Sequence, residues 1–375
     1  MSRLGGSPMR RWGTVAVTAS VVGLGLSPAV AHADDGEDLV TTVATGLGGP
    51  RQLNGYEGDD LVVAESDTGE VSRVSLDGKV ETLLSGLPSP QGVDLEDGKL
   101  YVALGASGPD EGGGAPPEPV EGEPQPSSLI VAGPGGDIVQ TYDLLEYELE
   151  NNPDEQQQFA DDGTPFDALS NPFSVLVQED RILVADAGAN ALLAIDRDSG
   201  EISTLFVPPR VSADEVAECA DAQANPGVEG CDPVPTGIDE ENGKLYLSTL
   251  GAEAPGAARV YVLDQDGDEI RRIEGLTSIT GLAVDGNDDA YVSELFFNAP
   301  ESEPGPDFDP TPVGRVVKIE RDGDREAAAV TLPTGLEFED GELYASAWSV
   351  AIFLGLEDRG EVVRIDDDAF TEIED

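Results

Sequence analysis

The sequence predicts an all-β fold, because short runs of β-branched residues alternate with turn-forming residues along the chain. Residues 170–200 show the pattern, with strand-like runs such as ILVADAG separated by turns at Asn171-Pro172 and at DRDSG. The same order of turns and strands recurs six times. A sheet of four short strands cannot bury both faces alone. We therefore expect the copies to stack in a ring, as a six-bladed β-propeller with four-stranded blades.

The repeats account for most of the chain. The six copies begin at Gly46, Gly86, Ser170, Val234, Gly275 and Leu332. A further strand, expected over residues 39–44, has no partner strands of its own. We expect this N-terminal strand to complete the sixth blade and so join the two ends of the chain.

Four insertions interrupt the repeats. Residues 105–127 are rich in Pro, Gly and Glu and are predicted to be disordered. Residues 143–150 predict one short helix that stops at Asn151-Asn152-Pro153. Residues 211–232 form a loop that carries both cysteines, and residues 298–312 form a Pro-rich excursion. All four leave from comparable places in the repeat, so we expect them to elaborate the propeller faces.

The N-terminus reads as a secretory signal. Arg3, Arg10 and Arg11 precede an uncharged run that closes on Ala31-His32-Ala33, which predicts removal of residues 1–33. The remaining residues 34–375 predict one domain, secreted as a monomer. The general secretory route is favoured, although Arg10-Arg11 leaves a twin-arginine route open. No later stretch approaches the roughly 18 apolar residues that a membrane span needs.

The charge balance limits the partners. The formal net charge is −56, with 76 Asp and Glu against 20 Lys and Arg. Nucleic acid and anionic membrane surfaces are excluded, because both require positive charge on the protein. The acidity fits a solvated, salt-adapted surface, and cation binding is the alternative interpretation.

Histidine and cysteine usage limits the chemistry. The only histidine, His32, lies in the signal segment, so the mature chain contains none. Mechanisms of the Ser-His-Asp or Cys-His kind and His-ligated zinc sites are therefore excluded. Cys219 and Cys231 bracket a short polar loop, which in an exported protein predicts a disulfide.

Several segments together resemble the ScyD/ScyE family of exported six-bladed propellers. The residues that carry the resemblance are LLEYELENNPDE (144–155), Ser170-Asn171-Pro172-Phe173, Val184-Ala185-Asp186-Ala187-Gly188-Ala189-Asn190, Val234-Pro235-Thr236-Gly237 and Pro255-Gly256-Ala257-Ala258-Arg259-Val260-Tyr261. More loosely, the chain is similar to NHL-repeat proteins and to calcium-dependent lactonases of the gluconolactonase type. The family has no settled activity, so the resemblance implies the fold more than the function.

The chain departs from the family at two places. Gly251-Ala252-Glu253-Ala254-Pro255 stands where the family commonly has an aromatic Gly-Phe-Pro stretch. Thr280 stands where the family often has an acidic residue. If these positions shape a ligand pocket, the pocket of this chain differs.

Aligning the second strands of the blades identifies candidate ligands. The aligned residues are Glu65, Leu104, Asp186, Thr249, Glu294 and Trp348. The carboxylates fall in the first, third and fifth blades, so we expect them to ring the channel. Calcium is the cation suited to such oxygen ligands, and Asn171 and Asn190 lie in loops that could add amide oxygens. The alternative is that these carboxylates only hydrate a wet pore.

Other motifs favour structural interpretations. Residues 264–268, DQDGD, resemble the start of an EF-hand loop, but the glycine is fourth instead of sixth, which indicates a hairpin turn. Trp348 and Tyr291 are expected to pack within blades. Two functions then remain open. The first is a ligand- or partner-binding scaffold that uses one mouth of the channel, and the alternative is a calcium-dependent lactonase or ester hydrolase.

Overall fold

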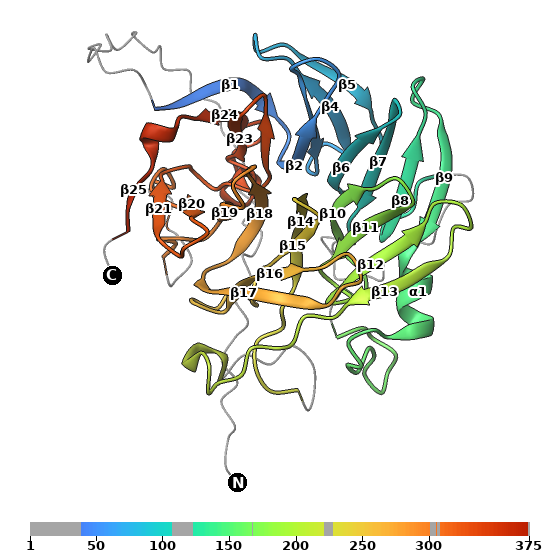
Figure 1. The fold of residues 1–375 in the computed structure, drawn as a ribbon. Coiled ribbons are helices and arrows are strands. Elements are labelled where there is room, and N and C mark those ends of the chain that lie inside the picture. Colours follow the sequence, from blue (N-terminus) through green and yellow to red (C-terminus); the bar gives the residue numbers. More distant parts are fainter. Residues whose placement is uncertain are drawn as a thin grey trace.

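The protein is a six-bladed β-propeller in the computed structural model, as predicted (Figure 1). The structure describes residues 39–106, 123–166, 168–220, 228–300, 305 and 308–373. The predicted signal segment and most of the insertion at 105–127 lie outside these residues. Among the described residues, no helix is both long enough and apolar enough to cross a membrane.

Blades 1 to 3 each contain four consecutive antiparallel strands. Blade 1 contains β2 (Pro50–Gly55), β3 (Leu61–Glu65), β4 (Glu70–Val74) and β5 (Val80–Leu84). Blade 2 contains β6 (Pro90–Glu96), β7 (Lys99–Leu104), β8 (Ser128–Ala132) and β9 (Ile138–Asp143). Blade 3 contains β10 (Pro172–Val177), β11 (Arg181–Asp186), β12 (Ala191–Asp196) and β13 (Ile202–Phe206).

Blades 4 to 6 complete the ring. Blade 4 contains β14 (Pro235–Glu241), β15 (Lys244–Thr249), β16 (Ala258–Leu263) and β17 (Glu269–Leu276). Blade 5 contains β18 (Ile279–Val284), β19 (Ala290–Glu294), β20 (Arg315–Ile319) and β21 (Arg325–Ala328). Blade 6 contains β22 (Leu336–Glu339), β23 (Glu342–Ala347) and β24 (Gly360–Ile365). The first strand of each blade lies innermost.

The N-terminal strand closes the ring, as predicted. β1 (Val40–Leu47) pairs antiparallel with β24 and becomes the outer strand of blade 6. At the other end of the chain, β25 (Thr371–Glu372) pairs with β21 and adds a fifth strand to blade 5. Each end of the chain is thus tied to a different blade.

The core lies between neighbouring blades, because the alternating apolar side chains of each sheet face the next sheet. Val260 and Val262 of blade 4 pack in one buried cluster with Val292 and Val317 of blade 5. Tyr291 packs edge-on against Phe338 and Phe370, which is the packing role expected for it. Each blade therefore supplies part of the core of both neighbours.

The inner strands approach one another very closely at a repeated glycine position. A Cβ atom on Gly281 would lie 1.9 Å from the carbonyl oxygen of Thr334 in the next blade. Gly335 would meet the carbonyl oxygen of Arg51 at 2.6 Å, and Gly92 that of Phe173 at 2.9 Å. Glycine is needed here because no side chain fits between the strands.

The predicted helix and disulfide are both present. α1 (Leu144–Asn151) begins after Asp143, whose carboxylate accepts the N–H of Glu146, and ends at the left-handed Asn152. Cys219 and Cys231 form a buried disulfide with a Cα–Cα distance of 5.1 Å. Residues 264–268 form the predicted hairpin turn, in which the N–H of Gly267 donates to the carbonyl oxygen of Asp264.

Candidate binding face and central channel

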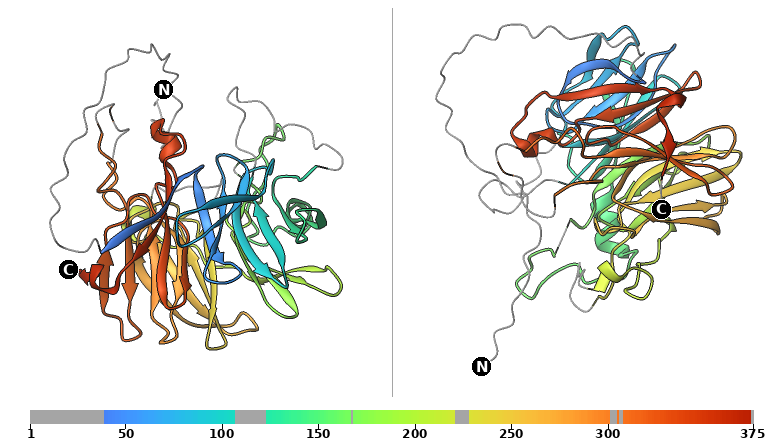
Figure 2. Two further views of the ribbon diagram at one scale, coloured as in Figure 1. Left: turned by 90° about the horizontal axis from the view of Figure 1, so that it is seen from above. Right: turned by 90° about the vertical axis from the view of Figure 1, so that its left-hand side faces the viewer.

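The long connections all leave from one end of the ring. Each blade starts at this end, so the connections between blades and those between second and third strands meet here. In Figure 2, left, the loops that include η2 (Ala351–Leu354) project from one edge of the strands, while tight hairpin turns occupy the opposite edge. We call this end the insertion face; it is formed by the described residues of the connections that join β7 to β8, β9 to β10, β13 to β14, β15 to β16, β19 to β20 and β23 to β24.

The three predicted carboxylates lie at equivalent positions beside the insertion face. Glu65, Asp186 and Glu294 are the last residues of their second strands, and all three are buried. Each is paired with the first residue of the inner strand in its own blade: Pro50, Pro172 and Ile279. The alignment of second strands therefore identified a true equivalence.

Each of these carboxylates binds the main chain that leads into the inner strand of its own blade. Glu65 accepts the N–H of Gly48 at 2.7 Å, and Glu294 accepts the N–H of Thr277 at 2.7 Å. Glu294 also pairs with Arg315, whose Nε lies 2.6 Å from Oε2. These contacts give the carboxylates a bracing role within single blades.

Asp186 accepts more hydrogen bonds than the other two carboxylates. Its oxygens accept the hydroxyl of Ser170 and the N–H groups of Asn171, Gly188 and Ala189 at 2.7–3.1 Å. Burial raises the pKa of Asp186, and these hydrogen bonds act in the opposite direction. The carboxylate holds together the segment that leads into β10 and the turn between β11 and β12.

Replacing Asp186 by Ala is expected to destabilise the fold by about 3 kcal/mol, because several buried N–H groups lose their acceptor. Thermal or urea unfolding would measure the loss. Asp266→Ala, at an exposed turn position, is the matched control and should change stability by less than about 0.5 kcal/mol. An Asp186→Ala variant as stable as the control would contradict the bracing role.

The two predicted asparagines also contact the main chain. Asn171 Oδ1 accepts the N–H of Ala106 at 2.9 Å. Asn190 Oδ1 accepts the N–H of Val234 at 3.0 Å, and its Nδ2 donates to Asp154 Oδ2 at 3.0 Å. Asn190 thus joins three segments of the insertion face.

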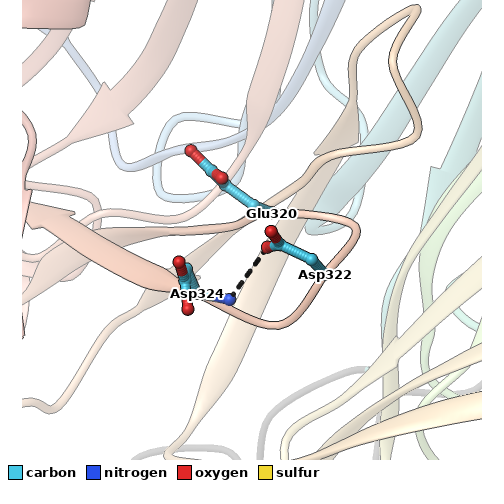
Figure 3. A group of neighbouring side chains, drawn as sticks. All are labelled: Glu320, Asp322 and Asp324. Atoms are coloured by element: carbon cyan, nitrogen blue, oxygen red, sulfur yellow. Dashed lines mark hydrogen bonds between the residues drawn. The ribbon is translucent and has the colours of Figure 1, made fainter.

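One acidic group among the described residues has metal-binding spacing, and it lies elsewhere. Glu320, Asp322 and Asp324 place one oxygen each within 4.8 Å of one another, in the turn between β20 and β21 (Figure 3). Asp322 and Asp324 are exposed, and Oδ1 of Asp322 is engaged by the N–H of Asp324 at 3.4 Å. The group is part of a hairpin turn. Glu65, Asp186 and Glu294 do not form such a group, and their calcium role stays a prediction.

A different set of carboxylates lines the channel. Asp94, Asp239 and Glu337 occupy equivalent positions on the inner strands of blades 2, 4 and 6. Oδ2 of Asp94 accepts the N–H of Val177 in blade 3 at 2.6 Å, and Oδ2 of Asp239 accepts that of Val284 in blade 5 at 2.7 Å. These two carboxylates therefore join neighbouring blades.

The channel carboxylates are poorly solvated and repel one another. Burial raises the pKa of Asp94 to about 6 and that of Asp239 to about 7. The pKa of Glu337 is raised well above its usual range by burial and then by the charges of Asp239 and Asp94. The motifs QGVD, TGID and TGLE mark these residues in the sequence, but the second-strand alignment did not include them.

A polar side chain crosses the middle of the ring. Gln52 of blade 1 is 6% exposed, and its Nε2 donates to the carbonyl oxygens of Thr236 at 3.0 Å and Thr280 at 2.7 Å. These acceptors belong to blades 4 and 5. Gln52 therefore bridges blade 1 to blades 4 and 5 across the ring, and Thr280 contributes its main-chain carbonyl to this bridge.

An apolar cavity opens on the insertion face beside blades 5 and 6. Its volume is about 280 Å³, and its walls include Phe296, Phe308, Val313, Leu332, Val350 and Phe353. Glu253, in the segment that departs from the family pattern, also lines it. Trp348 packs against the same apolar cluster, and the guanidinium of Arg359 lies 4.2 Å from the centre of its ring. Phe353 is 59% exposed, which is unusual for so large an apolar side chain.

The chain matches no protein-family model and no curated protein. It is similar to several solved structures. One is a streptogramin B lyase, with 11% identity, 89% of this chain and 97% of that chain covered, and a TM-score of 0.50. The shared feature is the six-bladed propeller fold.

Two further structures show the same likeness. A gluconolactonase from Xanthomonas campestris has 10% identity, with 86% of this chain and 88% of that chain covered and a TM-score of 0.52. A luciferin-regenerating enzyme has 10% identity, with 89% and 97% covered and a TM-score of 0.52. Because this fold carries unrelated activities, the likeness assigns no chemistry to this chain.

Proposed function

We propose that the protein is a secreted propeller of the ScyD/ScyE type that binds a small hydrophobic molecule in the apolar cavity of the insertion face. The cavity carries the proposal. It combines aromatic walls with an opening to solvent, which is typical of small-molecule sites. The buried disulfide between Cys219 and Cys231 lies in the connection between β13 and β14. It supports secretion, because disulfides persist in oxidising compartments.

The cavity also indicates the charge of the ligand. The side chains named in its walls are apolar apart from Glu253, and the protein as a whole carries a formal charge of −56. An anionic ligand would be repelled by this field, whereas a neutral ligand would not. A cation would lose its hydration against these apolar walls without a comparable gain. The proposed ligand class is therefore neutral, with an aromatic or aliphatic body that fits about 280 Å³.

Binding of the neutral fluorophore N-phenyl-1-naphthylamine tests this function. Ala299→Trp, which fills the cavity, and Phe353→Ser, which removes part of its wall, are each expected to weaken binding by about tenfold or more. Ile352→Ser is the matched control, since Ile352 is 39% exposed on the same loop but does not line the cavity. Equal binding by the Ala299→Trp variant and the unaltered protein would refute the proposal.

The alternative is a calcium-dependent lactonase or ester hydrolase. Turnover of a panel of lactones, with calcium and with EDTA, tests it directly. Turnover that EDTA abolishes and that Ala299→Trp leaves intact would favour the hydrolase over the binding scaffold.

A further inference from the structure

A second cavity on the insertion face is polar. Its volume is about 420 Å³, and its walls include Asp154, Gln156, Asn190 and Arg210. It forms where three segments meet: the loop after α1, the turn after β11 and the segment before β14. The hydrogen bonds of Asn190 to Asp154 and to the N–H of Val234 hold the three together.

Two carboxylates contact Gln156, one through its main-chain N–H and the other through its side-chain amide. The N–H of Gln156 donates to Asp154 Oδ1 at 2.9 Å, and its Nε2 donates to Asp232 Oδ1 at 2.8 Å. Asp232 is only 4% exposed. Among the residues that the structure describes, no Lys or Arg forms an ion pair with Asp154 or Asp232. Asp154 lines the cavity and Asp232 lies behind Gln156, so two carboxylates lie together without an ion-paired cation. Arg210, in the cavity wall, acts on Asp232 only from beyond ion-pair distance.

The other end of the Gln156 amide has no partner. Gln156 is 6% exposed, and within the described part of the chain its Oε1 is buried without a hydrogen bond. A buried polar atom left in this state is costly and rare in folded proteins. A positively charged ligand would give this oxygen a partner and would balance the charges of the nearby carboxylates.

We propose that this polar cavity binds a divalent cation of the calcium class, with Asp154, Asp232 and Gln156 Oε1 as protein ligands. All three are hard oxygen donors, and calcium accepts six to eight oxygens in flexible geometry, so main-chain carbonyls and water can complete the shell. The bound ion neutralises the carboxylates and satisfies the amide oxygen. This site is independent of the apolar cavity and of the calcium ring predicted at Glu65, Asp186 and Glu294.

Calcium titration of the mature, disulfide-intact protein tests the site. Calorimetry is carried out at high NaCl concentration, which screens the acidic surface. We expect one saturable site and a rise in melting temperature that EDTA reverses, because an ion that binds only the folded state stabilises it. Calcium that gives neither heat nor a melting shift beyond that of added NaCl would overturn the proposal.

Variants locate the ion. Asp154→Asn and Gln156→Leu should each weaken calcium binding by about tenfold or more. Asp154→Asn keeps an oxygen that can accept from Asn190, and circular dichroism confirms that the variants are folded. Asp322→Asn makes the same charge change in the exposed turn and should leave calcium affinity unchanged. A loss in Glu65→Gln with none in Asp154→Asn would place the ion at the predicted ring instead and overturn the site.

Discussion

Gly281→Ala is expected to destabilise the propeller by at least about 3 kcal/mol and to lower its melting temperature accordingly. The new Cβ atom would lie 1.9 Å from the carbonyl oxygen of Thr334. This oxygen belongs to the main chain, so no side-chain rotation can relieve the clash. Relief of this contact requires the inner strands of blades 5 and 6 to separate, which loosens the ring at its narrowest point.

Gly286→Ala is the matched control for this substitution. Gly286 lies in the turn after β18 of the same blade, and a Cβ atom there would meet nothing within 4 Å. We expect its effect to stay within about 0.5 kcal/mol. Urea unfolding of both variants gives the comparison, and equal stability of the two would show that the inner strands have room that the structure does not indicate.

Stability is expected to rise as the pH falls from 8 to about 5. The pKa values of Asp94 and Asp239 are raised to about 6 and about 7, whereas an unfolded Asp titrates near 3.9. Between about pH 4 and pH 7 the folded state therefore binds more protons than the unfolded state, so ionisation on raising the pH destabilises the fold. Below about pH 4 stability is expected to stop rising. The Lys244 ion pair lowers the pKa of Asp288 to about 2, so protonation of Asp288 at low pH removes the stability that this ion pair contributes.

Asp239→Asn tests the source of this pH dependence. It removes the charge and keeps an oxygen that can accept from Val284, while its amide nitrogen loses the acceptor role toward the N–H of Glu240. Because removal of the buried charge outweighs this lost hydrogen bond, it should stabilise the protein by about 1–3 kcal/mol at pH 8 and reduce the slope of the profile between pH 5 and 8. Asp266→Asn makes the same change in net charge at an exposed turn and should leave the slope unaltered. Melting curves at constant ionic strength measure both, and parallel profiles for Asp239→Asn and the unaltered protein would contradict the assignment.

The repeat allowed the blades and the closing strand to be predicted from the sequence, and residue usage in the insertions predicted the helix and the disulfide. Turn residues and period-two alternation are local signals, so they can be recognised in the sequence without knowledge of the fold. The equivalence of Glu65, Asp186 and Glu294 was visible for the same reason. The hydrogen bonds of these carboxylates to the preceding loops could not be predicted, because the direction in which a strand's last side chain points depends on the surrounding chain.

The channel carboxylates escaped prediction for a geometric reason. The inner strands of blades 2 and 4 contain a register shift at their start, between Pro90 and Gly92 and between Pro235 and Gly237. Such a bulge changes which later residues face the channel, and alternation alone cannot locate it. The polar cavity was hidden for another reason, since Gln156 and Asp232 lie 76 positions apart and meet only after the blades stack.

The pairing of β1 with β24 sets the order in which the ring can be finished. The four main strands of each of blades 1 to 5 follow one another in the sequence and pair in that order. Blade 6 differs, because its outer strand β1 comes from the opposite end of the chain: Val40 pairs with Ile365. Non-local pairings of this kind are slow to form. Among the described strands, β1 is made first and would therefore wait for β24, which is made almost last. Until then the outer edge of β24 would be open to pairing with other chains.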